Sequence, residues 1–321
     1  MPPLQSIGTT LRSRYRIDKV LFETKLINIY FVNDLHMAGK SWVLREMQMV
    51  AIDSHERSRT IRKFQQEASE IAAISHPVIA TVVDFFVEGS NLYIVRDYVP
   101  GNDLASLSKI NQRPFTEIEV LTWSVQLAEA LSFFFGKKMP AIFFREFHMG
   151  NIIDTGNAGI KLIDLGLARI FQTESDTENL SRLGSMEYAS PEQFSEDAAF
   201  DIRSLVYSLG AFMYHALTNV NPSSSPFDLK PISLLNPMIS KSVQDIINRA
   251  TEIDPKKRYQ TLNDMKRDLL QVLKSLRVET AAPAKESPTA KGALLNWLLG
   301  ILLAVIIGAV LFLAYYFFVK P

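Results

Sequence analysis

The spacing of apolar and polar residues changes once along the chain, near residue 100. Before that point, short runs rich in β-branched and aromatic residues predict strands. These runs are residues 15–22, 27–34, 41–47, 80–89 and 91–99. Between them, residues 59–74 (RTIRKFQQEASEIAAI) repeat apolar residues at helical spacing. They predict a helix with one apolar face, made of Ile61, Phe64, Ala68, Ile71 and Ala72.

After Gly101 the pattern becomes mostly helical. Three long amphipathic or apolar stretches predict helices over residues 115–135, 202–218 and 241–251. Residues 151–155 and 160–164 form a small predicted hairpin between them. A sheet-rich lobe followed by a helical lobe predicts an α+β fold with a cleft between the two lobes.

The C-terminal residues predict a membrane anchor. No charged residue occurs between Trp297 and Val319, and roughly 20 apolar residues suffice to cross a hydrocarbon core of about 30 Å. A buried core helix is the alternative, which so long an uncharged run disfavours. Aromatic residues lie at both ends of the run, as they do in membrane interfaces. We therefore predict one transmembrane helix over residues 293–319.

The residues around this helix predict its orientation. The chain starts without the apolar core of a signal peptide. Basic residues before the span outnumber Lys320 beyond it, so the positive-inside rule predicts a cytoplasmic folded domain and a tail anchor; they are Lys274, Arg277, Lys285 and Lys291. Residues 278–292 (VETAAPAKESPTAKG) read as a flexible linker. The folded domain is then residues 11–277, with lobes at 11–99 and 100–277, after a short N-terminal tail (1–10).

Composition excludes several classes of protein. The 34 basic residues balance the 34 acidic ones, so no overall positive field attracts nucleic acid. The chain has no cysteine, which excludes disulfides, a thiol nucleophile and thiolate metal sites. Its five histidines include no H-x-x-x-H pair, which excludes a zinc-protease helix.

Several collinear segments resemble conserved parts of one enzyme family. FFREFHMGNII resembles a catalytic loop H-R-D-x-x-x-x-N, LIDLGLAR a D-F-G segment, and SMEYASPEQF an A-P-E segment. FQQEASEIAAISHPVIATVVDFF and DPKKRYQT add a helix C and a late arginine turn. Together they resemble the eukaryotic-like serine/threonine protein kinases of bacteria, over about residues 11–275. The resemblance implies a two-lobed kinase fold, with a small β-rich N-lobe and a large helical C-lobe.

The resemblance also implies a set of site residues for phosphoryl transfer. Glu146 stands in place of the catalytic Asp, and Asn151 and Asp164 match the two magnesium ligands. Turn hydrogen bonds are the alternative role for this Asn and Asp. Arg45 stands in place of the strand lysine and matches helix-C Glu67 as a partner. Arg45 then either forms a structural bridge to Glu67 or contacts phosphate.

The same alignment shows where the nucleotide site departs from the family. Side chains replace the glycines of the phosphate-covering turn, so its backbone no longer approaches phosphate closely; they are Phe22, Thr24 and Ile27. Val43 replaces a small alanine over the adenine. Arg96 falls at the gatekeeper position, where a buried cation needs a partner such as Glu67 or Asp164. The alternative is a one-position alignment slip that leaves Arg96 at the surface.

Other matching positions concern the fold and the activation segment. Glu192 and Arg258 match a buried ion pair of the helical lobe. Phe144 and Leu205 replace a polar pair and suggest an apolar contact. The segment 169–186 is rich in Ser, Thr and acidic residues, so it is either a phosphorylation target or a merely solvated loop.

The departures concentrate in the nucleotide site, whereas the fold residues persist. We therefore expect a membrane-anchored pseudokinase that acts as a signalling scaffold or allosteric regulator. The alternative is an atypical, weakly active serine/threonine kinase. Mg-ATP is the only cofactor that the resemblance implies. The expected partners are the membrane, through the C-terminal helix, and a cytoplasmic protein, but no nucleic acid.

Overall fold

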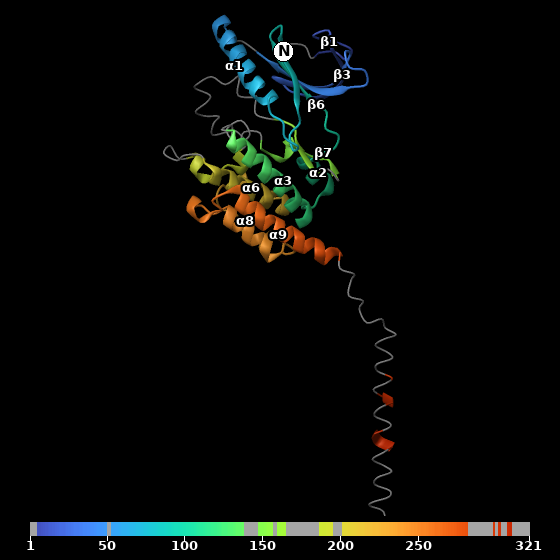
Figure 1. Ribbon diagram of the computed structural model, residues 1–321, viewed down its shortest axis with the longest axis vertical. Coiled ribbons are helices and arrows are strands. Elements are labelled where there is room, and N and C mark those ends of the chain that lie inside the picture. The colour runs from blue at the N-terminus through green and yellow to red at the C-terminus, as the bar shows by residue number, and fades with distance from the viewer. Residues whose placement is uncertain are drawn as a thin grey trace, which may run out of the picture. The chain divides into compact units, whose positions relative to one another are not determined.

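The computed structural model describes residues 5–49, 53–137, 147–156, 159–164, 186–194, 201–281, and 298, 301–302 and 307–309. The chain divides into two compact units, Met1–Lys274 and Ser275–Pro321. In the first unit, a twisted sheet with one helix lies beside a larger group of helices (Figure 1). The expected β-rich and helical lobes are both present.

The N-lobe is built on one antiparallel sheet with strand order β1-β2-β3-β4-β6-β5. Its strands are β1 (Thr10–Leu11), β2 (Tyr15–Glu23), β3 (Ile27–Asp34), β4 (Ser41–Gln48), β5 (Val82–Glu88) and β6 (Asn91–Asp97). Strands β2 to β6 follow the predicted runs closely because each run is bounded by turn residues, whereas β1 has no predicted run. The sheet order brings β4 into the centre, between β3 and β6.

Alternate side chains of the sheet enter two different environments, because successive residues of a strand point to opposite faces. One face packs a buried cluster that includes Tyr30, Trp42, Leu44 and Tyr93. The N-terminal residues cover this face, since the backbone N–H of Gln5 donates to the Tyr30 hydroxyl at 3.3 Å. The other face, with the odd-numbered residues of β4, looks toward the C-lobe.

Helix α1 (Ser54–Ala72) packs along the sheet with the face that its sequence predicts. Phe64, Ala68 and Ile71 are buried. The helix begins five residues before the predicted stretch because the Asp53 carboxylate caps its first turn, accepting from the N–H groups of His55 and Glu56.

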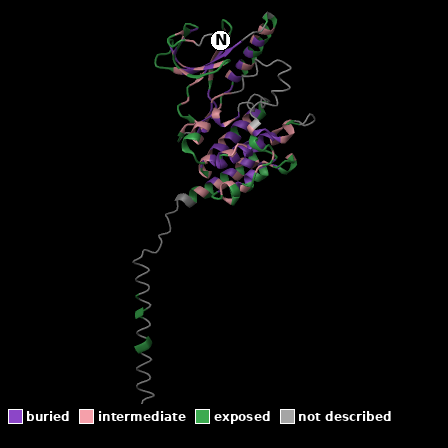
Figure 2. Cartoon of the chain, turned by 180° about the vertical axis from the view of Figure 1, so that it is seen from behind, coloured by how far each residue is buried: buried purple, intermediate pink, exposed green. Residues whose placement is uncertain are grey.

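The C-lobe contains the remaining helices of the first unit. They are α2 (Leu104–Asn111), α3 (Glu117–Gly136), α6 (Ile202–Thr218), α7 (Ile232–Leu235), α8 (Lys241–Ala250) and α9 (Leu262–Ala281), with short 3-10 turns at Met149–Asn151, Met186–Tyr188, Pro191–Phe194, Pro222–Ser224 and Pro255–Lys257. Helix α6 is apolar on most sides and lies in the centre, packed on α3 and α8. Buried residues fill the interior of this lobe (Figure 2).

A small second sheet lies at the junction of the lobes. It consists of β7 (Asn102–Asp103), β8 (Ile152–Asp154) and β9 (Ile160–Leu162), in the order β7-β8-β9. Strand β9 also bonds to the chain that leads into β5, because the Ala80 N–H donates to the Leu162 carbonyl at 2.8 Å and the Leu162 N–H donates to the Val78 carbonyl at 2.7 Å. These bonds tie the predicted hairpin to the N-lobe.

The predicted linker and membrane helix fall mostly outside the described residues. Helix α9 continues to Ala281, so the first residues of the predicted linker are helical. Residues 298, 301–302 and 307–309 are helical and exposed. Among the described residues, α3 is the helix long and apolar enough to cross a membrane, and half of its apolar window is buried inside the protein.

Candidate functional site between the lobes

Strand β4 presents Val43 and Arg45 toward the C-lobe. In the sheet register, Val43 pairs with Phe31 and Arg96, and Arg45 pairs with Ile29 and Ile94. Val43 is 4% exposed and Arg45 is 8% exposed. The valine and the arginine therefore lie side by side with Arg96 on the inner face of the sheet.

Arg45 forms an ion pair with Asp164 rather than a contact with solvent. Its Nη1 donates to the Asp164 carboxylate in a short hydrogen bond. The side chains of Arg45 and Asp164 are 10% and 19% exposed, so the pair lies largely out of water and is screened little. The ion pair shown for Arg45 thus joins it to the predicted metal ligand, while Glu67 lies half-buried on α1.

Arg96 lies in the same region and is half-buried. Its Nη1 donates to the backbone carbonyl of Asp97 at 3.3 Å. Burial lowers the pKa of Arg96 to about 10, although the nearby Asp164 charge works in the opposite direction. This placement favours the gatekeeper alignment over the one-position slip.

The two predicted metal ligands lie at one end of the β8–β9 hairpin. Asn151 directly precedes β8 and Asp164 follows β9 by two residues. The Ile163 N–H donates to the Asn151 carbonyl at 3.0 Å, which closes this end of the hairpin. The fold therefore brings both residues together, as the sequence spacing implies.

The turn between β2 and β3 uses its own backbone donors. The Thr24 hydroxyl accepts from the N–H groups of Leu26 and Ile27 at 3.3 and 2.9 Å. The Thr24 N–H donates to the Ile27 carbonyl at 2.8 Å. Since these N–H groups are already bonded, they do not offer a cradle for phosphate. The sequence predicts Thr24 only as the replacement of a glycine, although a threonine at a turn is a known signal for such bonds.

Two groups that would hold a magnesium-bound nucleotide are already bonded within the protein. The carboxylate that would take the metal is bonded to Arg45, and the turn that would cover phosphate is closed by Thr24. Glu146, in the place of the catalytic Asp, and Phe144 lie outside the described residues, as does the segment 165–185. The predicted contact between Phe144 and the buried Leu205 therefore stays a prediction.

Comparison with known proteins identifies the architecture. Residues 36–278 match the protein kinase domain. The chain belongs to the protein kinase family. It is related to the bacterial serine/threonine kinases: it is 29% identical to the serine/threonine-protein kinase PrkC of Bacillus subtilis over 274 residues, which is 82% of this chain and 41% of PrkC. It is 27% identical to PknB of Mycobacterium tuberculosis over 279 residues, 82% of this chain and 43% of PknB.

A solved kinase domain has the same fold. The kinase domain of M. tuberculosis PknI superposes with a TM-score of 0.64 at 23% identity, covering 84% of this chain and 99% of that domain. The curated relatives are longer, and the chain spans about 40% of the length of PrkC and PknB.

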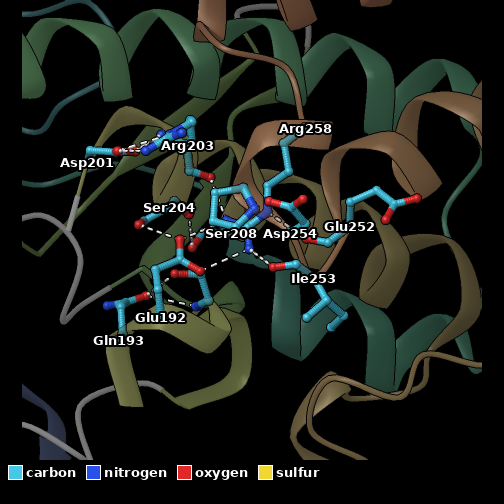
Figure 3. A network of polar contacts seen from close by, with 12 residues as sticks. Glu192, Gln193, Asp201, Arg203, Ser204, Ser208, Glu252, Ile253, Asp254 and Arg258 are labelled. Atoms are coloured by element: carbon cyan, nitrogen blue, oxygen red, sulfur yellow. Dashed lines mark hydrogen bonds and ion pairs between the residues drawn. The ribbon is translucent and has the colours of Figure 1, made fainter. Parts of the chain in front are cut away.

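The predicted ion pair between Glu192 and Arg258 is present in the C-lobe. The Arg258 Nη1 and Nη2 atoms donate to the two Glu192 carboxylate oxygens at 2.7 and 2.9 Å, which confirms this prediction. Arg258 also donates to the carbonyls of Arg203, Glu252 and Ile253 (Figure 3). Burial disfavours the Glu192 carboxylate, but hydrogen bonds from Arg258 and Ser204 outweigh it and hold the pKa of Glu192 at about 2.

The kinase domain also contains a cavity that the sequence did not predict. It has a volume of about 300 Å³ and lies beside the catalytic loop, with His148, Glu187 and His215 in its wall. The Tyr188 hydroxyl and His215 Nδ1 are 2.8 Å apart. Burial lowers the pKa values of both histidines, which favours neutral rings at neutral pH. These residues are far apart in sequence and carry no shared motif.

Proposed function

We propose that this protein is a pseudokinase, a kinase domain that serves as a scaffold or allosteric regulator instead of an efficient phosphotransferase. The observation that carries the proposal is the ion pair between Arg45 and Asp164. A metal ion needs the Asp164 carboxylate, and phosphate needs a cation at position 45. Because each group neutralises the other, a magnesium-bound nucleotide must first break a largely buried pair.

Two further features support the proposal. The turn closed by Thr24 has its N–H groups engaged in internal bonds. The gatekeeper Arg96 brings a cation and a long side chain to the inner face of the sheet, next to Val43. A flat adenine ring would displace both, at the cost of placing a half-buried guanidinium against an apolar ligand surface.

The proposal includes the location of the domain. The uncharged run at residues 293–319 anchors the protein in a membrane, and the basic residues before it keep the kinase domain on the cytoplasmic side. The partner is then a cytoplasmic protein that meets the domain at the membrane. An altered activity of that partner separates a regulator from a scaffold.

A weakly active serine/threonine kinase is the second candidate. It is favoured by the meeting of Asn151 and Asp164 at one end of the β8–β9 hairpin, because an amide and a carboxylate oxygen are suitable magnesium ligands. This candidate uses Arg45 toward phosphate and Glu146 toward the substrate hydroxyl.

Nucleotide binding by the full chain in detergent tests the proposal. Unfolding is followed with and without Mg-ATP by the fluorescence of the buried Trp42 and Trp123. At 100 times its dissociation constant, a nucleotide stabilises by about 2.7 kcal/mol, a shift of a few degrees. We expect no shift at millimolar Mg-ATP in the wild type. A magnesium-dependent shift that Asp164→Asn abolishes, with phosphate transfer to a peptide, contradicts the pseudokinase proposal.

The variant Arg45→Lys sharpens this test. The lysine ammonium keeps the positive charge of Arg45, but it is more compact than the guanidinium and forms a weaker ion pair with Asp164. If the pair is what blocks the site, this variant binds Mg-ATP more tightly than the wild type. Arg113→Lys, at an exposed arginine, is the matched control and leaves binding unchanged.

A further inference from the structure

The last helix of the kinase domain, α9, has one buried side and one exposed side. The buried side packs into the C-lobe with residues that are at most 6% exposed: Leu262, Met265, Leu269 and Leu273. The exposed side is called here the outer face of α9, and it consists of Asn263, Arg267, Leu270, Lys274, Arg277 and Val278. Their positions recur every three or four residues, so they lie along one side of the helix.

Charge is distributed unevenly around α9. The outer face carries three basic residues, Arg267, Lys274 and Arg277, and no acidic one. With about 3.6 residues per turn, the acidic positions 264, 268 and 279 fall roughly a third of a turn away. A solvated surface usually intersperses both signs of charge. The segregation therefore indicates a face that meets something negatively charged.

The carboxylate beside the outer face does not neutralise it. The Arg267 Nη2 atom donates to Asp264 at 2.5 Å, but the two side chains are 72% and 42% exposed, so water screens this pair. Lys274 forms no ion pair with any residue that the structure describes. Arg267 and Lys274 can therefore contact an anion outside the protein without breaking a strong internal bond.

Two large apolar side chains accompany the basic ones. Leu270 is 44% exposed and Val278 is 63% exposed. Helices that lie at a membrane surface combine these kinds of residue, because apolar side chains enter the headgroup layer while Lys and Arg reach the lipid phosphates with their flexible stems. The outer face thus fits a surface that is both anionic and apolar, as a lipid leaflet is.

The length of chain after α9 keeps this face near the membrane. Helix α9 ends at Ala281, and the proposed membrane helix begins at residue 293. The eleven residues between them, 282–292, span about 20 Å on average as a flexible chain, at about 5–6 Å times the square root of the residue number. The cytoplasmic leaflet is anionic, and each Lys or Arg close to it strengthens binding about fivefold.

We propose that the outer face of α9 binds anionic phospholipid headgroups of the membrane in which the chain is anchored. The inference rests on the proposed function in one respect, the membrane anchor, and adds the orientation of the kinase domain. Helix α9 lies at the end of the C-lobe away from the N-lobe sheet (Figure 1). With α9 on the lipid, the N-lobe and the cleft stay open to a cytoplasmic partner.

A fluorescent label on the outer face tests the contact. The chain has no cysteine, so Asn263→Cys gives a single site for an environment-sensitive fluorophore, at the residue of the face farthest from the anchor in sequence. The full chain is reconstituted in neutral phosphatidylcholine vesicles and in vesicles that also contain phosphatidylglycerol. We expect a blue shift, and quenching by nitroxide-bearing lipid, in the anionic vesicles alone. The same label at Gln65→Cys, an exposed residue of α1, stays in water in both.

Charge variants test the basic residues. Lys274→Gln combined with Arg277→Gln removes two of the three charges, and the equilibrium constant for contact should fall about 30-fold, at roughly fivefold per residue. Arg62→Gln combined with Lys63→Gln removes two exposed charges of α1 and leaves the contact unchanged. An Asn263→Cys label that stays in water on anionic vesicles, or an equal loss of contact in both double variants, refutes the proposal.

Flotation with neutral vesicles separates this proposal from the membrane anchor. A chain that does not float with them lacks the anchor, which overturns the proposed location and this inference with it. A chain that floats, but whose label stays in water on anionic vesicles, has the anchor and no lipid-binding face. That result overturns the inference alone.

Discussion

The ion pair between Glu192 and Arg258 allows the most quantitative prediction about this kinase domain. In the variant Glu192→Gln the amide keeps the size of the side chain but removes its charge. Arg258, which is 1% exposed, then retains its bonds to backbone carbonyls but loses its carboxylate. Breaking a buried ion pair by removing one partner typically costs about 3–5 kcal/mol.

The pKa of Glu192 gives an independent estimate of the same quantity. It falls from the ordinary 4.5 of a glutamate to about 2 in the folded protein. Each pH unit between these values contributes about 1.4 kcal/mol, so the ionised carboxylate stabilises the fold by about 3 kcal/mol. Because the folded pKa is depressed, this contribution is complete above pH 4.5 and is lost as the pH falls toward 2.

Urea unfolding of both proteins across this pH range checks the reasoning. The difference in free energy of unfolding between wild type and Glu192→Gln should be largest at pH 6 and shrink steadily below pH 4.5. Taking the difference cancels the other carboxylates that titrate in acid. Glu23→Gln, at an exposed glutamate, is the control and should show no such difference. A wild-type advantage that stays constant down to pH 3 would refute the electrostatic account.

Three further predictions concern packing, histidines and the turn. Gly210→Ala should destabilise by about 1–3 kcal/mol in urea unfolding, because its new methyl carbon would lie 2.7 Å from the Ala250 side chain; unchanged stability would show that α6 and α8 separate easily. Burial lowers the pKa values of His148 and His215, and of His76, so the folded state disfavours their protonation and the melting temperature should fall as the pH drops below about 6.5; replacing His148 and His215 by Asn should reduce this dependence, and an equal slope would contradict it. Thr24→Val should cost about 0.5–1.5 kcal/mol, because two backbone N–H groups lose their hydroxyl acceptor; a thermal melt as stable as wild type would show that water replaces the hydroxyl.

The sequence determined the elements of this protein and their order. Helix α6 covers the residues that the pattern predicts, 202–218. A long apolar run flanked by polar residues is compatible with few secondary structures other than a buried helix. The strands follow their predicted runs for the same reason. The pair of Glu192 and Arg258 was also readable, since both positions match the family resemblance. Secondary structure and short motifs depend on residues that are close together in the sequence, so they can be predicted without knowing the tertiary contacts.

Only the tertiary structure decided how the charges of the cleft pair. From the sequence, Glu67 and Asp164 were both candidate partners for the arginines of the sheet. In the fold Arg45 pairs with Asp164, although 119 residues separate them in the sequence. A shift of one residue in the register of β4 would turn Arg45 to the opposite face. Such pairings depend on the register of the strands and the approach of the two lobes, and no local pattern of residues encodes either.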